Sequence, residues 1–171
     1  MPRRKDFVVV EQLENAIFNL LKEKEYKDIS ISELCDKAWV SRCTFYRNYK
    51  SMDDIIYQYF MRESQIWWDE NYNLFLKEEN YISLSLFKYL LSLKERIIIV
   101  YQRGLSYIFE KHIFDSAING RDIFDKEQSY SSARVSGAIV GLTNEWVRRG
   151  MQDSPEYLAK FLNKEIEYRT I

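Results

Sequence analysis

The sequence predicts an all-α protein with two parts, a small N-terminal three-helix bundle and a larger C-terminal helical bundle. Only 5 Gly and 2 Pro occur in the 171 residues, so few positions interrupt long helices. Apolar residues make up 46% of the chain and recur at helical spacing, which indicates amphipathic helices around a core. We expect about nine helices. The N-terminal domain is expected over residues 1–52 and the C-terminal domain over residues 53–171.

Residues 8–25 are predicted to form the first helix, because apolar side chains recur on one face and charged ones fill the other. Two shorter helices are expected over 32–38 and 42–49, joined by residues 39–41. Each has a narrow apolar stripe, and two such helices with a tight turn are typical of a helix-turn-helix motif, whose second helix enters the DNA major groove. A helical hairpin with a solvated polar face has the same spacing, so spacing alone leaves both interpretations open.

The outward face of the second short helix carries side chains suited to DNA. When Phe45 and Tyr49 face the core, a rotation of about 100° per residue points Cys43, Thr44 and Arg47 away from it. Tyr46 and Asn48 then lie on the flanks, and Arg42 sits at the helix start. Arg suits guanine, Asn suits adenine and a small side chain such as Cys can meet a thymine methyl. Tyr46 and Lys50 are better placed for phosphates, which fix register without reading sequence. The candidate DNA-binding residues are Arg42, Cys43, Thr44, Tyr46, Arg47, Asn48 and Lys50.

This stretch closely resembles the DNA-binding region of TetR-family transcriptional regulators, over roughly residues 8–57. The matching pattern is a Ser-initiated helix ending in Ala, a Val-Ser turn, and a Thr-x-Tyr-x-x-aromatic run. The residues that carry it are Ser32, Ala38, Val40, Ser41, Cys43, Thr44, Phe45, Tyr46 and Tyr49. The resemblance implies DNA contacts at the positions named above from Arg42 to Asn48. It also implies a dimer with an effector pocket in the C-terminal domain.

The sequence departs from the family pattern at two positions. Trp39 stands where the turn usually has Gly, and a bulky residue in a left-handed backbone costs roughly 1 kcal/mol or more. Either Trp39 bears that strain against favourable packing or the turn is built differently. Met52 stands where the family has a phosphate-binding Lys, and Lys50 is the candidate replacement.

The rest of the chain is predicted to be helical with short breaks. Residues 53–75 are predicted to form one helix of about 33 Å that links the N-terminal three-helix bundle to the C-terminal helical bundle. A helix from residue 95 either ends at 101 or continues to 118 through a bend near Gly104. Residues 121–128 are polar and are expected to form a loop or a frayed helix. The other expected helices cover 81–92, 131–150 and 155–168.

The helix over 131–150 carries Gly137 and Gly141 on one face. Gly inside a helix costs about 1 kcal/mol relative to Ala, so two on one stripe indicate that another helix approaches closely. Residues 137–156 are similar to the C-terminal end of the TetR subgroup that includes the dihydroxyacetone kinase operon regulator. The resemblance implies a four-helix dimer interface near Gly137, Val140, Gly141 and Leu158. The alternative is that the stripe packs within one subunit.

Aromatic residues are abundant in the predicted C-terminal domain, and the resemblance implies a small-molecule effector pocket there. Pockets between bundle helices are usual ligand sites. The candidate pocket residues are Trp67, Tyr101, Phe109 and His112. The alternative is that these rings are simply core residues.

Several function classes are disfavoured by composition. There is one His, no phosphate-binding Gly loop and no nucleophile elbow, so we expect no enzymatic activity, no metal and no cofactor. Two Cys and the lack of an 18-residue apolar run or a signal-peptide core favour a reduced, cytoplasmic, non-membrane protein. Net charge is −1, with residues 1–50 carrying 10 basic and 8 acidic side chains, so DNA contacts must come from local cations.

Together these observations predict a dimeric transcriptional regulator. It would be a repressor whose two N-terminal bundles bind a pseudo-palindromic double-stranded operator. A small-molecule effector would release it by binding the non-DNA conformation better. Two alternatives stay open. The body binds a partner protein instead of a small ligand, or the chain has lost DNA binding, for which Trp39 and Met52 are the motivating departures.

Overall fold

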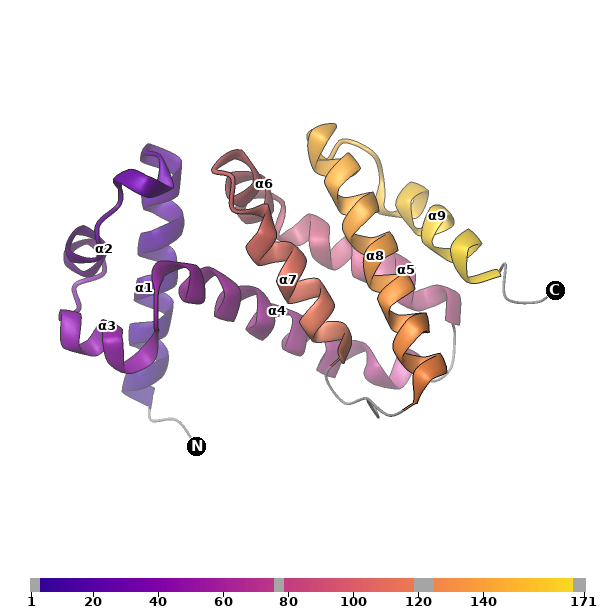
Figure 1. Cartoon of the computed structure of the whole chain (residues 1–171), viewed down its shortest axis with the longest axis horizontal. Helices are drawn as coiled ribbons and strands as arrows, with labels where there is room; N and C mark the ends of the chain where they lie inside the picture. Colours follow the sequence, from indigo (N-terminus) through magenta and orange to yellow (C-terminus); the bar gives the residue numbers. More distant parts are fainter. Residues whose placement is uncertain (1–3, 76–78, 119–124, 168–171) are drawn as a thin grey trace.

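The structure is a computed structural model that describes residues 4–75, 79–118 and 125–167 (Figure 1). Within these ranges the chain is helical and contains no strand, which confirms the predicted fold class. The elements are α1 Arg4–Glu23, the short 3₁₀ helix η1 Tyr26–Asp28, α2 Ile31–Lys37, α3 Arg42–Asn48, α4 Met52–Phe75, α5 Glu79–Ser92, α6 Lys94–Gln102, α7 Ser106–Ile118, α8 Lys126–Arg148 and α9 Pro155–Glu167.

The head consists of α1, α2 and α3, which pack together at one end of the molecule (Figure 1). Their apolar stripes meet in a closed core in which Leu13, Ile17, Leu34 and Phe45 are fully buried. Two short helices of seven residues are too short to be stable alone, so this core and their caps hold them in place. α4 then runs from the head into the body (Figure 1).

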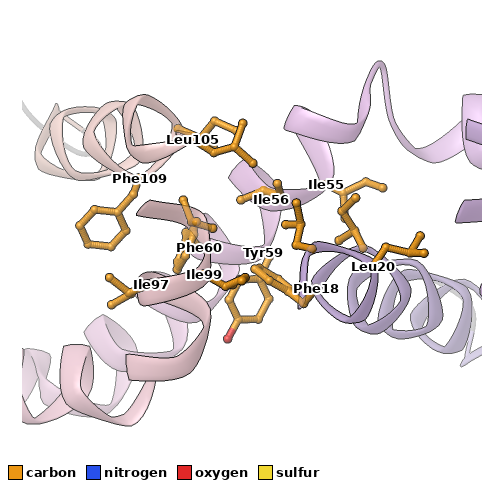
Figure 2. Packing of buried hydrophobic residues seen from close by; sticks show 14 of the residues in the cluster. Phe18, Leu20, Ile55, Ile56, Tyr59, Phe60, Ile97, Ile99, Leu105 and Phe109 are labelled. Carbon is orange, nitrogen blue, oxygen red and sulfur yellow. The ribbon is translucent and has the colours of Figure 1, made fainter. Parts of the chain in front are cut away.

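One continuous core joins the head to the body along α4. Figure 2 shows side chains from α1, α4, α6 and α7 meeting around the first half of α4. On one side, the ring of Tyr59 packs edge-on against Phe18 of α1, with 5.0 Å between centroids. On the other, Phe60 packs edge-on against Phe109 of α7 at 5.2 Å. α4 is therefore buried against both parts, and the division into two domains at residues 52 and 53 stays a prediction.

The helices α5 to α9 form the body of the molecule (Figure 1). In it, α5 packs on α9, while α8 lies between α7 and α9. The turn from α8 to α9 is fixed by Trp146, which is buried against Phe87 of α5 and donates its indole N–H to the carbonyl of Asp153 at 3.0 Å. Gly150 has a φ of 70°, as expected for a left-handed residue after a helix end.

The start of α8 is the predicted boundary that differs most from the structure. α8 begins at Lys126, five residues earlier than expected, because Asp125 accepts hydrogen bonds from the backbone N–H groups of Glu127 and Gln128 at 3.0 and 3.2 Å. Of the loop and the frayed helix that we expected over 121–128, the structure has helix at residues 126–128, while residues 121–124 lie outside the described part, as does residue 168. At Gly104, φ is 70° and the backbone breaks, so α6 and α7 are separate helices.

Candidate nucleic-acid interface

Serine caps define the two short helices of the head. The Oγ of Ser30 accepts from the backbone N–H of Glu33 at 3.1 Å, and the Oγ of Ser41 accepts from that of Thr44 at 3.1 Å. Each cap satisfies a helix-end donor and fixes where the helix starts. The predicted helix-turn-helix is therefore present, with α2 and α3 joined by residues 38–41.

The turn between α2 and α3 is left-handed at Trp39, whose φ is 55°. The turn closes with hydrogen bonds from the N–H of Trp39 to the carbonyl of Asp36 at 3.2 Å and from the N–H of Val40 to that of Cys35 at 3.0 Å. The backbone thus takes the form that Gly would adopt freely, at a cost of roughly 1 kcal/mol or more. The side chain of Trp39 is 90% exposed, so packing within the subunit does not offset that strain.

α3 presents most of the predicted DNA-binding residues to solvent. Phe45 and Tyr49 are buried as expected. Thr44 and Asn48 are half-buried: Thr44 lies within 2.9 Å of the Ser41 hydroxyl, and the Asn48 amide donates to the Thr44 carbonyl at 2.7 Å. The remaining candidates are exposed, namely Arg42, Cys43, Tyr46, Arg47 and Lys50. The structure thus brings all seven onto or beside α3, and their role in DNA binding stays a prediction.

Three other cations of the head lie in ion pairs, whereas Lys27 has none among the described pairs. Lys22, Lys24 and Lys37 each lie in an ion pair, with Glu95, Glu33 and Glu23 at 3.2, 2.6 and 2.6 Å. Among the ion pairs of the described residues, none involves Arg42, Arg47 or Lys50. Three exposed positive charges on or just after α3 are therefore left to attract an anionic partner.

Met52 opens α4 and cannot supply a charge to a phosphate. It is half-buried and packs against the hydrophobic core. Ser51 caps the helix by accepting from the N–H of Asp54 at 3.1 Å, and the Asp54 carboxylate accepts from the backbone N–H of Lys50 at 2.9 Å. The side chain of Lys50 is exposed beside this cap, so it is the available cation at this end of α3.

A polar junction that no local sequence pattern indicates ties the head to α6 and α7. The carboxylate of Asp53 accepts from the hydroxyls of Tyr26 in η1 and Tyr107 in α7, the latter at 2.5 Å. Burial and the bond to Asp53 raise the pKa of Tyr107 to about 12 and that of Tyr26 further. Arg103 donates to the carbonyl of Leu21 near the end of α1 at 2.7 Å.

A second part of the junction buries charge against aromatic rings. The guanidinium of Arg96 in α6 lies 4.2 Å from the ring centroid of Tyr59 and 4.8 Å from that of Phe18. Beside it, Glu14 of α1 is almost fully buried and accepts two hydrogen bonds from Arg62 of α4. Burial lowers the pKa of Arg62, but its bonds to Glu14 and Glu63 outweigh that effect and raise it, so the guanidinium stays charged.

The four predicted effector-pocket residues lie in the body, and each has partners within the subunit. His112 is fully buried between the rings of Phe60 and Phe109, and its Nε2 is hydrogen-bonded to the Ser64 hydroxyl. Tyr101 packs on Phe109 at 6.0 Å and its hydroxyl donates to Asn144.

The Trp67 indole N–H donates to Ser85 at 3.0 Å, and its ring stacks on that of Tyr89 at 5.6 Å. Tyr89 reaches Ser64, the residue bonded to His112, at 3.3 Å. These rings therefore form a packed interior, which fits the alternative of core aromatics. Their role as an effector pocket stays a prediction.

The predicted dimer residues divide between surface and core. Gly137 and Gly141 are exposed on α8, and a Cβ added at either would meet nothing within 4 Å. The close approach that two helical glycines indicate is therefore not made within the subunit. Val140 is half-buried, and Leu158 is 5% exposed because it packs into the core of its own subunit. The dimer interface stays a prediction.

The head on a helical body defines the class of the protein, an all-helical protein with an N-terminal helix-turn-helix. A family model of the TetR type, described as a transcriptional regulator C-terminal region, matches residues 77–168. That match covers more than half of the chain, so the chain belongs to the TetR family of transcriptional regulators. Comparison with curated proteins finds no match. The resemblance to the dihydroxyacetone kinase regulator subgroup is not confirmed.

The described ranges contain neither a membrane-spanning helix nor a cluster of metal-binding side chains. No helix there is both long and apolar enough to cross a bilayer. Over the same ranges, no group of three or more His, Cys, Asp and Glu side chains is placed to hold a metal ion.

Proposed function

We propose that this transcriptional regulator is a homodimeric repressor that binds a pseudo-palindromic operator through α3 and is released by a small-molecule effector. The observation that carries the proposal is the exposed face of α3. It presents Arg42, Arg47 and Lys50 without ion-pair partners among the described residues, beside Cys43 and Tyr46. Arg at such positions can read guanine, and Lys and Tyr can hold phosphates.

A dimer follows from the size of the reading element. α3 has seven residues and can meet only a few base pairs. Two copies related by a twofold axis, with heads roughly 34 Å apart, would read two half-sites. The exposed face of α8 around Gly137 and Gly141 supports such pairing, and so do the exposed rings of Tyr157 and Phe161 on α9, whose centroids are 5.1 Å apart.

The effector would bind between the body helices, near Trp67, Tyr101, Phe109 and His112, and would favour a conformation whose heads do not fit the operator. The packed state of these rings also supports a second candidate. In that version the same cytoplasmic regulator is controlled by a partner protein on its surface, as the resemblance to the dihydroxyacetone subgroup suggests. Isothermal titration with candidate ligands, against co-purification of a partner, separates the two.

Selection of bound sequences from a random DNA pool tests the proposal directly. We expect an enriched palindrome with half-sites one helical turn apart. Arg47→Ala should then weaken binding by about tenfold or more and relax the preference at one base pair, as loss of a base contact of about 1–3 kcal/mol predicts.

Arg148→Ala serves as the control, since it removes the same charge from an exposed position at the end of α8. It should leave operator affinity unchanged. If the wild-type chain enriches no sequence and binds DNA only as weakly as any basic protein does, the DNA-binding proposal is wrong.

A further inference from the structure

Trp39 combines a costly backbone conformation with an almost fully exposed side chain. Its φ is 55°, in the left-handed region that favours Gly, and 90% of its surface is exposed. Met151 is the other described non-Gly residue with positive φ, but it is 2% exposed, so burial of its side chain offsets its strain. Gly104 and Gly150 carry similar angles with no side chain. Trp39 therefore bears a strain that nothing in the described part of its own subunit offsets.

The position of Trp39 places its indole beside the expected path of DNA. It lies two residues before Ser41, the cap of α3, and three before Arg42. Three residues span at most about 11 Å, and the major groove is about 12 Å wide, so the indole can reach the backbone that walls the groove occupied by α3. Figure 1 shows that the connection from α2 to α3 lies on the side of the head away from the body.

The surface around Trp39 is suited to a sugar–phosphate chain. A shallow concavity of about 270 Å³ adjoins the indole. None of the residues described as lining it is acidic, and the polar ones are Gln12, Asn15, Asn19 and Lys37. Amide and ammonium side chains are common donors to phosphate oxygens. Lys37 is also paired with Glu23 at 2.6 Å, and the amide oxygen of Asn15 accepts from Arg96 of α6 at 3.1 Å, which leaves its NH₂ group to donate.

We propose that Trp39 is a positioning residue for DNA binding, which contacts the sugar–phosphate backbone flanking the groove that α3 enters. Its indole N–H donates to a phosphate oxygen and its ring packs on a deoxyribose. The proposal rests on the proposed function, because it requires α3 to enter DNA. It gives the strained Trp39 a role, because the left-handed turn leaves the ring exposed on the surface of the head.

Such a contact has a distinct signature because the indole is neutral. It does not displace a counterion, so its loss weakens binding to every sequence without changing the slope of log affinity against log salt. Loss of Lys50 should instead reduce that slope by about one. The two backbone contacts can therefore be told apart in the same assay.

Two substitutions separate the ring from the backbone strain. Trp39→Gly removes both, whereas Trp39→Ala removes the ring and keeps the Cβ that causes the strain. We expect both variants to bind the selected operator about tenfold more weakly, as loss of a hydrogen bond to a charged group predicts. We expect Trp39→Gly alone to raise Tm, by about 2–4 °C. A Trp39→Gly variant that is more stable and still binds the operator as tightly as wild type overturns the proposal and leaves Trp39 for a protein partner.

Acrylamide quenching of tryptophan fluorescence gives a direct second readout. Trp39 is far more exposed than Trp68, at 37%, or Trp146, at 1%, so it should dominate the readily quenched signal. Operator DNA should protect that signal in the wild type and cause no such change in Trp39→Phe. Absence of protection at saturating DNA overturns the proposal.

Failure of the proposed function gives a different pattern. If the wild type and Arg47→Ala both bind DNA without sequence preference, both proposals fall together. If the wild type binds an operator and Arg47→Ala weakens it while Trp39→Gly does not, only the role of Trp39 is overturned.

Discussion

At the scale of single residues, His112 should make the stability of the protein depend on pH. It is the one His of the chain and is fully buried, and burial lowers its pKa to about 4. In the unfolded chain the ring has an ordinary pKa of about 6.5. The unfolded state therefore binds more protons between these values, and stability falls as pH falls from about 6.5 to 4, by about 3 kcal/mol at most.

Urea unfolding at several pH values between 7.5 and 4 measures this loss. Buried carboxylates also titrate at the acidic end, so the readout is the difference between wild type and His112→Phe, which cannot take up a proton. The variant should lose less stability than the wild type as pH falls to 5. Equal losses in the two proteins would show that His112 is not the group responsible.

Residue patterns predicted the reading face of α3 better than its turn. The spacing of Phe45 and Tyr49 was enough to place Cys43 and Arg47 in solvent, because α3 is a regular helix with one buried stripe. The exposure of Trp39 was not predictable. A pattern of residue types indicates where φ is positive, but not whether neighbouring elements cover the side chain.

At the scale of elements, the contacts between α6–α7 and the head should carry much of the stability of α1. Arg103 follows α6, and its side chain is 20% exposed. It donates to the Leu21 carbonyl and pairs with Glu25, so it caps the end of α1 from the body. Arg103→Ala leaves these groups without that partner and should destabilise the protein by about 1.5–3 kcal/mol.

Urea unfolding of Arg103→Ala and Arg148→Ala provides the comparison. The side chain of Arg148 is 71% exposed and pairs only with nearby Glu145 among the described ion pairs, so its loss should cost less than about 1 kcal/mol. Amide hydrogen exchange should also become faster at the end of α1 in Arg103→Ala and stay unchanged in α9. Equal destabilisation by the two substitutions would argue against a special role for the junction.

Helices were predictable where the sequence carries caps and breakers, and contacts between them were not. Ser41 and Pro155 mark the starts of α3 and α9, where the structure has them. The first residues of α8 are polar, so the sequence leaves a loop and a frayed helix open there, and the cap at Asp125 marks where the helix starts. The bond from Tyr107 to Asp53 joins residues 54 positions apart, so no local pattern could indicate it.

At the scale of the whole molecule, a substitution on the exposed face of α8 tests whether the protein is a dimer. Within one subunit, a Cβ at Gly141 meets nothing within 4 Å, so a larger side chain is tolerated there and improves helix propensity by about 0.8–1 kcal/mol. If α8 packs against its twofold mate, the same side chain lies in the interface and holds the two helices apart. Gly141→Leu should therefore leave the monomer folded, or stabilise it, while weakening the dimer.

Size-exclusion chromatography with light scattering should give a dimer for the wild type at micromolar concentration and a monomer for Gly141→Leu. Gln128→Leu is the matched control, because it lies on the opposite side of α8 by helical spacing and is also exposed. It should stay dimeric. Operator affinity should fall together with dimerisation in Gly141→Leu, because one head alone contacts a single half-site. A wild-type monomer, or a Gly141→Leu dimer that binds the operator as wild type does, would mean that this face of α8 does not join the two subunits.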